Sequence, residues 1–191
     1  MAPPNFAKQG TEGGAALLEQ LPTGHVIHTL VSEHVQILGF LRQVDDLNTK
    51  LSECGSREAG EPVLAELVPA AQNLVDAEKH HAREEEALFP EMESRGVSGP
   101  TTVMRQEHEF LRPLKQRLLD QARTAPGDRP FDQLKKAISD TAVRLVPNLV
   151  AHIQKEDSVL YPMALQVIPD AAVWEGMKVR CDEIGYCPFT E

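Results

Sequence analysis

Two stretches of the chain decide the fold, HHAREEEALFPEM at residues 80–92 and HIQKEDSVLYPMA at residues 152–164. Each contains a His-x-x-x-Glu spacing followed by Leu, an aromatic residue and Pro. Side chains four residues apart lie on one face of an α-helix, about one turn apart. The two stretches therefore predict two helices that each present an imidazole and a carboxylate to one site.

A second pair of matching segments precedes these motifs. SEHVQILGFL at 32–41 aligns with QEHEFLRPLK at 106–115, which places His34 on His108. The two offsets are nearly equal, 74 residues for the single histidines and 72 residues for the His-x-x-x-Glu motifs. A duplicated helical hairpin accounts for both matches.

Apolar residues at spacings of three and four predict four amphipathic helices. The patterns cover about 27–51, 63–94, 100–118 and 131–168, and breaks rich in Gly, Pro or Ser separate them. No stretch alternates with a period of two, so no sheet is predicted. Four helices with short connections predict an all-α fold, an antiparallel up-down-up-down four-helix bundle over residues 21–168.

The two ends of the chain have a different composition. Residues 1–20 are rich in Gly, Pro and small residues and are predicted to form a flexible N-terminal arm. Residues 169–191 are predicted to form a short C-terminal helix and a tail packed on the bundle. Three cysteines, Cys54, Cys181 and Cys187, are too few for a disulfide framework and are expected to be reduced thiols.

The charge balance excludes some classes of partner. The chain has 19 Lys and Arg against 29 Asp and Glu, a net charge of −10, which disfavours binding to nucleic acid and to anionic membranes. No apolar run is long enough to span a bilayer, and the first residues lack the layout of a secretory signal. We therefore expect a cytoplasmic protein with no nucleic-acid or membrane partner.

The repeat brings six side chains with metal-binding chemistry to one level of the bundle. The predicted metal ligands are His34, His80, Glu84, His108, His152 and Glu156. Such groups are too costly to bury in a core unless they are paired or coordinated. Mixed imidazole and carboxylate ligands suit iron, manganese or zinc. If both glutamates bridge, with a bridging oxide or hydroxide, two octahedral ions are held with about two positions open.

One apolar spacing favours different ligands in the second helix. A seven-residue step reaches His81 and points it, with Glu85, into the core in place of His80 and Glu84. The repeat favours His80 and Glu84, and a kink at Pro69 would rotate the helix enough to reconcile the two patterns. We therefore assign His80 and Glu84 as the ligands of this helix and keep His81 and Glu85 as the alternatives.

Other polar residues near the motifs have less defined roles. Asp157 is an alternative ligand to Glu156. Tyr161 either lies near the metals, where it donates a proton or an electron, or packs as an ordinary aromatic residue at the helix end. By helical phase, His25 and His28 point away from the ligand face and are expected at the surface or at the helix start.

These segments resemble the hemerythrin-like, or HHE cation-binding, domain family over about residues 22–166. HHAREEEALFP and HIQKEDSVLYP are similar to the family's two His-x-x-x-Glu helices, and SEHVQIL and QEHEFL are similar to its two single-histidine helices. The resemblance implies a non-haem di-iron site in a four-helix bundle, with two iron ions as the cofactor.

Two departures from relatives bear on the function. Oxygen-carrying hemerythrins have a second histidine one turn before the single histidine of the third helix, and this chain has Met104 there. The di-iron proteins that repair damaged iron centres add an N-terminal module that contains cysteine, and residues 1–20 contain none.

Two kinds of function are favoured over a third, a purely structural bundle. The first is a binding protein that takes up dioxygen, or senses oxygen, nitric oxide or iron. The second is a di-iron enzyme that decomposes peroxide or handles nitric oxide. Both need an open metal position, so the expected partner in either case is a small diatomic ligand or peroxide.

Overall fold

The computed structural model describes residues 11–124 and 126–191. Within these residues all regular structure is helical and no strand is present, so the all-α prediction is confirmed. No helix among them combines the length and apolar character needed to cross a membrane. The elements are α1 (Glu12–Gln20), α2 (Val26–Glu53), α3 (Arg57–Asp76), α4 (Glu78–Arg83), η1 (Glu84–Leu88), α5 (Phe89–Glu93), α6 (Gly99–Ala122), α7 (Phe131–Lys155), η2 (Glu156–Leu160), α8 (Tyr161–Val167) and α9 (Ala171–Ile184).

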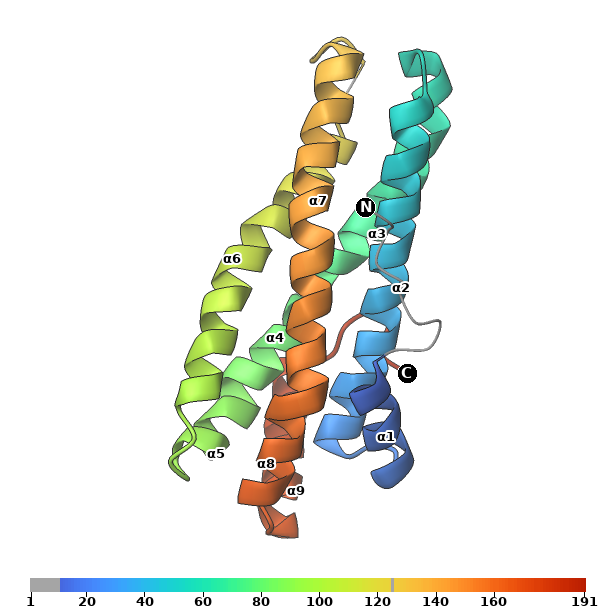
Figure 1. Ribbon diagram of the computed structural model, residues 1–191. Helices are drawn as coiled ribbons and strands as arrows, with labels where there is room; N and C mark the ends of the chain where they lie inside the picture. Colours follow the sequence, from blue (N-terminus) through green and yellow to red (C-terminus); the bar gives the residue numbers. More distant parts are fainter. Residues whose placement is uncertain (1–10, 125) are drawn as a thin grey trace.

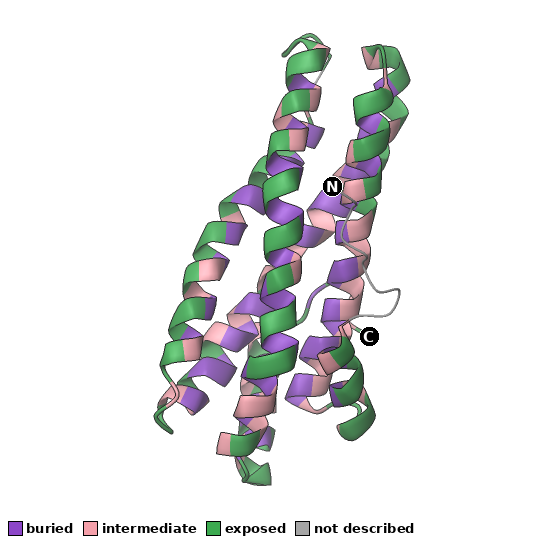
Figure 2. Cartoon of the chain, viewed as in Figure 1, coloured by how far each residue is buried: buried purple, intermediate pink, exposed green. Residues whose placement is uncertain are grey.

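Four long helices pack side by side along most of their length (Figure 1). The helix α2 contacts α3, α3 contacts α6, α6 contacts α7, and α7 contacts α2, so the four enclose a common interior. Buried residues line the inward faces of these helices and exposed residues the outward faces (Figure 2). This distribution is the one that an apolar spacing of three and four predicts.

The apolar interior consists of two clusters with a polar layer between them. On α2, Val31 belongs to one cluster and Ile37 to the other. On α6, Met104 and Leu111 are divided in the same way. The single histidine of each helix falls between these two residues in the sequence. The predicted ligands therefore lie where apolar packing on both sides keeps water out.

Both His-x-x-x-Glu helices change to π-helix at the ligand glutamate. The π segments are Glu84–Leu88, which follows α4, and Glu156–Leu160, which follows α7. In each, the amide of the next aromatic residue donates to the carbonyl five residues earlier. The residue after that is Pro, which has no N–H to continue the α-helical pattern. The wider turn was not predicted, because the sequence patterns assume 3.6 residues per turn.

The N-terminal segment departs from the predicted flexible arm. Residues 12–20 form α1, whose first turn is capped by the hydroxyl of Thr11. Leu17 is buried in the apolar cluster that contains Val31, and Thr11 also donates a hydrogen bond to Asp157. The prediction is therefore wrong for residues 12–20, because a capped turn and one buried leucine hold the segment against η2. Residues 1–10 lie outside the described part of the chain.

The C-terminal segment packs beside the polar layer. The helix α9 contacts α2, α4 and η1, and it buries Trp174, Met177 and Cys181. Beyond α9, Cys187 is buried and Thr190 donates a hydrogen bond to Glu33. Within the described residues all three cysteines are free, as the sequence predicted.

Candidate metal centre

The six predicted ligands meet in the polar layer between the two apolar clusters. None is more than 1% exposed. Three come from the long helices, His34 on α2, His108 on α6 and His152 on α7, and three from short helical segments, His80 on α4, Glu84 at the start of η1 and Glu156 at the start of η2. Residues far apart in the sequence thus converge in one buried site.

The four histidines form two close pairs through their Nε2 atoms. These atoms are 3.1 Å apart in His34 and His80, and also 3.1 Å apart in His108 and His152. Two imidazole nitrogens that each lie ~2.1 Å from one transition-metal ion, in adjacent octahedral positions, are about 3 Å apart. Each pair therefore has the spacing of two ligands on one ion.

The two glutamates lie between the histidine pairs. The Oε2 atom of Glu156 is 3.2 Å from Nε2 of His34, and its Oε1 atom is 2.8 Å from Nε2 of His152. The Oε2 atom of Glu84 lies 3.7 and 3.5 Å from Nε2 of one histidine of each pair. Both carboxylates thus approach both pairs, which is the position of a bridging ligand.

Each of these histidines also directs its Nδ1 atom at a second carboxylate. The Nδ1 to oxygen distances are 2.8 Å for His34 and Asp157, 2.7 Å for His80 and Glu33, 2.6 Å for His108 and Glu85, and 2.8 Å for His152 and Glu107. An ionised carboxylate only accepts hydrogen bonds, so Nδ1 donates and Nε2 keeps its lone pair. Metal-bound histidines typically have this outer carboxylate.

The outer carboxylates follow the same internal repeat as the ligands. Glu33 and Glu107 each precede the single histidine of their half, and Glu85 and Asp157 each follow the ligand glutamate. Glu33 and Glu107 each accept from the second ligand histidine of their own hairpin. Glu85 and Asp157 each accept from the single histidine of the other hairpin. These roles of Glu33 and Glu107 were not predicted from the sequence, although an acidic residue stands beside every motif in both halves and was the available signal.

Glu33 is the most firmly held of the outer carboxylates. It pairs with the buried Arg83 at 2.5 Å and accepts a hydrogen bond from Thr190. Although burial raises its pKa, the hydrogen bond from His80 and the charge of Arg83 lower the pKa of Glu33 to about 2. Glu33 is therefore ionised at neutral pH and fixes the orientation of the His80 ring.

The donor atoms at the centre need a cation. Oε2 of Glu84 and both carboxylate oxygens of Glu156 are buried and make no hydrogen bond. Burial and the neighbouring charge of Glu156 raise the pKa of Glu84 well above the usual range of a carboxyl group. Converging imidazole lone pairs and carboxylate oxygens repel one another unless positive charge lies between them. The residues present therefore fit a pair of metal ions.

One further polar side chain reaches the centre. The hydroxyl of Tyr161 donates to Oε1 of Glu84 at 2.9 Å and lies 3.5 Å from the Nε2 atoms of His34 and His80. Burial and the charge of Glu84 raise the pKa of Tyr161 well above its usual value, so the hydroxyl keeps its proton. The repeat counterpart of Tyr161 is Phe89, which carries no hydroxyl.

The structure separates the alternative ligands that the sequence left open. Glu85 and Asp157 occupy outer positions and bind histidine Nδ1 atoms. His81 is buried, and one of its nitrogens lies within 4.8 Å of a nitrogen of each of two other histidines. His80 and His81 do not exclude each other, because the first faces α2 and the second faces α6.

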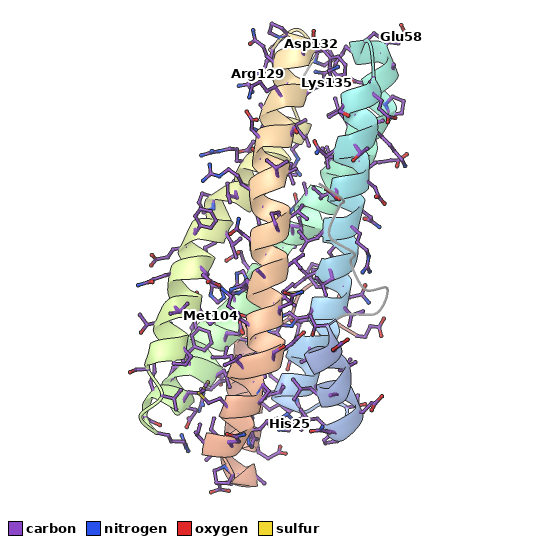
Figure 3. All side chains as sticks on the ribbon, in the orientation of Figure 1. His25, Glu58, Met104, Arg129, Asp132 and Lys135 are labelled. Carbon is purple, nitrogen blue, oxygen red and sulfur yellow. The ribbon has the colours of Figure 1, made fainter. Side chains whose placement is uncertain are left out.

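Residues predicted to lie away from the ligand face do so. His25 caps α2 and packs on Trp174 with ring centroids 4.6 Å apart, at one end of the bundle (Figure 3). His28 contacts Ser32 on its own helix. Among the described residues, neither histidine belongs to a group that is able to hold a metal. Met104 is buried on α6, one turn before the histidine of that helix (Figure 3).

Comparison with known proteins agrees with this geometry. The family model of the hemerythrin HHE cation-binding domain matches residues 25–164, and the chain therefore belongs to that family. The match includes all six predicted ligands. No curated protein matches the chain in sequence.

Proposed function

We propose that this chain is a di-iron protein that binds or senses a small oxidant, either dioxygen, peroxide or nitric oxide. The observation that carries the proposal is the pair of Nε2 contacts at 3.1 Å with two glutamates between them. The proposed ligands are His34 and His80 for one ion, His108 and His152 for the other, and Glu84 and Glu156 for both. The family supports cation binding, and mixed imidazole and carboxylate donors favour iron.

The proposed arrangement of the bundle is antiparallel, with α2, α3, α6 and α7 in up-down-up-down order. The contact of each helix with the next, and the short connections between them, support this order (Figure 1). Such an order brings the single-histidine helices and the His-x-x-x-Glu helices to the same level.

Iron bound at this site supplies redox chemistry and open coordination positions for a small molecule. The protein's own residues do the rest. The apolar clusters on both sides exclude water, and the outer carboxylates keep every Nδ1 protonated and every Nε2 free to bind metal. Tyr161 holds a proton on its hydroxyl oxygen, 2.9 Å from Glu84. Large apolar side chains fill the space on both sides of the centre, so the proposed ligand is a molecule of a few atoms.

The alternative is a di-iron enzyme that decomposes peroxide or handles nitric oxide. Tyr161 favours it, because a buried hydroxyl that donates to a ligand carboxylate is placed to supply a proton to a reduced oxygen or nitrogen atom. Reversible binding alone needs no such proton donor.

Metal analysis followed by rapid mixing tests the proposal. Elemental analysis of the purified protein is expected to give close to two irons per chain, and a protein with zinc alone, or with no metal, would contradict it. The reduced protein is then mixed with dioxygen and, separately, with peroxide in a stopped-flow spectrometer. A persistent spectral change supports binding or sensing, whereas repeated consumption of peroxide supports the enzyme.

A further inference from the structure

His81 breaks an otherwise consistent internal symmetry. Every ligand and every outer carboxylate described above has a counterpart of the same kind in the other half of the chain. The counterpart of His81 is Ile153, which is buried in the apolar core. The two polar neighbours of His81, Glu78 and Lys115, also have apolar counterparts, Val150 and Leu41 respectively. One side of the bundle thus contains a polar group of three residues, in which His81 and Lys115 are buried and Glu78 is partly exposed, whereas the corresponding positions on the other side are apolar.

The ring of His81 lies against the second histidine pair. It is 3% exposed and stacks on His108, with ring centroids 4.0 Å apart and planes inclined by 16°. Its centroid is 5.9 Å from that of His152. One nitrogen from each of these three histidines lies within 4.8 Å of the other two. Three imidazoles thus surround one point, whereas two surround the corresponding point in the first pair.

Like the four predicted histidine ligands, His81 has a carboxylate beside its Nδ1 atom, although at a longer distance. Its Nδ1 atom is 3.3 Å from Oε1 of Glu78, a carboxylate, but makes no hydrogen bond with it. Glu78 is itself held by Arg112, at 2.7 Å, and by the buried Lys115. His25, by contrast, uses Nδ1 to accept from a backbone amide.

We infer that His81 is a fifth imidazole ligand, which binds through Nε2 to the metal ion held by His108 and His152, and that Glu78 positions its ring. This inference rests on the proposed metal-binding function. It makes the two metal ions inequivalent, since one has three imidazoles and the other has two with the hydroxyl of Tyr161 beside them. A histidine kept only for packing would need neither the carboxylate behind Nδ1 nor the buried lysine that holds this carboxylate.

Iron retention in matched variants tests the inference. His81→Ile copies the residue of the other half, and His28→Ile removes a histidine outside the centre. With both variants and the wild type loaded with ⁵⁷Fe, we expect two unequal Mössbauer doublets in the wild type and in His28→Ile. In His81→Ile, one iron is expected to leave to a chelator at least about 10-fold faster than in the wild type, with the doublet of that iron lost or changed.

Further variants make the outcome decisive. Glu78→Gln keeps the shape of its side chain but weakens the hold on His81, so it is expected to speed release of the same iron less than His81→Ile does. If His81→Ile lacks wild-type helical circular dichroism, His81→Gln replaces it in the same measurement. Wild-type release rates and unchanged doublets in the folded His81 variant would overturn the inference. A wild-type chain that binds no iron would instead overturn the proposed function, and the role of His81 with it.

Discussion

The two nitrogens of each histidine at this centre have separate tasks. Nδ1 is occupied by a carboxylate, which fixes the tautomer and the direction of the ring, so that only Nε2 is left for a metal. At His34 this carboxylate is Asp157, supplied by the opposite hairpin. The same carboxylates that orient the rings thus add the negative charge that a metal ion balances.

The first prediction concerns the two glutamates between the histidine pairs. Glu84→Ala and Glu156→Ala are each expected to weaken iron binding by at least roughly 10–100-fold, because each removes a donor shared by both ions. His28→Ala is the control, since His28 hydrogen-bonds with Ser32 on its own helix and belongs to none of the possible metal-binding groups of the described residues. Iron content after gel filtration is the measurement, and equal content in all three variants would contradict the ligand assignment.

The sequence predicted six side chains at one level of the bundle, and the structure brings these six together, because matched motifs are local. It predicted their surroundings less well, because these depend on the turn geometry of individual elements. The π segment at Glu84–Leu88 follows from a proline that interrupts the α-helical hydrogen bonds, and an apolar pattern does not detect it. The apolar pattern also treated His80 and His81 as mutually exclusive core residues. In the structure both are buried, because these adjacent positions of α4 face different helices. The helix α1 is held mainly by one buried apolar side chain, Leu17. One leucine in a glycine-rich segment is too weak a sequence signal to predict a packed helix.

The second prediction tests the docking of α1 on the centre. A Cβ atom at Gly14 would lie 2.7 Å from Oδ2 of Asp157, which is held by the hydroxyl of Thr11. Gly14→Ala is therefore expected to weaken the docking of α1 by ~1–3 kcal/mol, more than the ~1 kcal/mol that alanine gains in a helix.

Hydrogen exchange of the α1 amides measures this effect. The control is Gly176→Ala, an exposed position on α9 where a Cβ atom would meet nothing within 4 Å. The control is expected to raise the free energy of unfolding by ~0.5–1 kcal/mol. Slower exchange of α1 in Gly14→Ala than in the wild type would show that the segment does not pack on Asp157.

The third prediction concerns the thiols of the C-terminal segment. Burial raises the pKa of Cys181 and that of Cys187 to about 11 each. At pH 8, three units lower, roughly one in a thousand of these thiols is present as the reactive thiolate. Cys54 is only partly buried and is expected to be alkylated first by iodoacetamide.

Mass spectrometry of the labelled cysteines checks this expectation. In Cys54→Ser, the labelling rate of the two remaining thiols is expected to rise about tenfold for each pH unit up to about pH 11, since each unit increases the thiolate fraction tenfold. Rapid labelling of all three cysteines at pH 8 would show that α9 and the segment after it do not stay packed.

At the scale of the whole molecule, the bundle is a duplicated hairpin whose two halves are no longer equivalent. The ligands and outer carboxylates keep the two-fold pattern, while Tyr161 is opposed by Phe89 and His81 by Ile153. Each departure adds a polar group beside a different histidine pair. One side of the centre therefore has a hydroxyl and the other an extra imidazole, and this asymmetry would make two bound ions inequivalent.

The last prediction follows from the cost of the polar layer to the fold. Without a cation, converging acceptors are buried between two apolar clusters, so metal binding and folding are coupled. At a free iron concentration 100 times the dissociation constant, each site stabilises the fold by about 2.7 kcal/mol. For a chain of this size that is roughly 5–10 °C in Tm per site.

Removing iron with a chelator under reducing conditions is therefore expected to lower Tm by at least this amount. Calorimetry of wild type and Glu84→Ala, before and after chelation, measures it. The variant is expected to respond little, and an equal fall in Tm in both proteins would mean that the loss of stability does not arise at this centre.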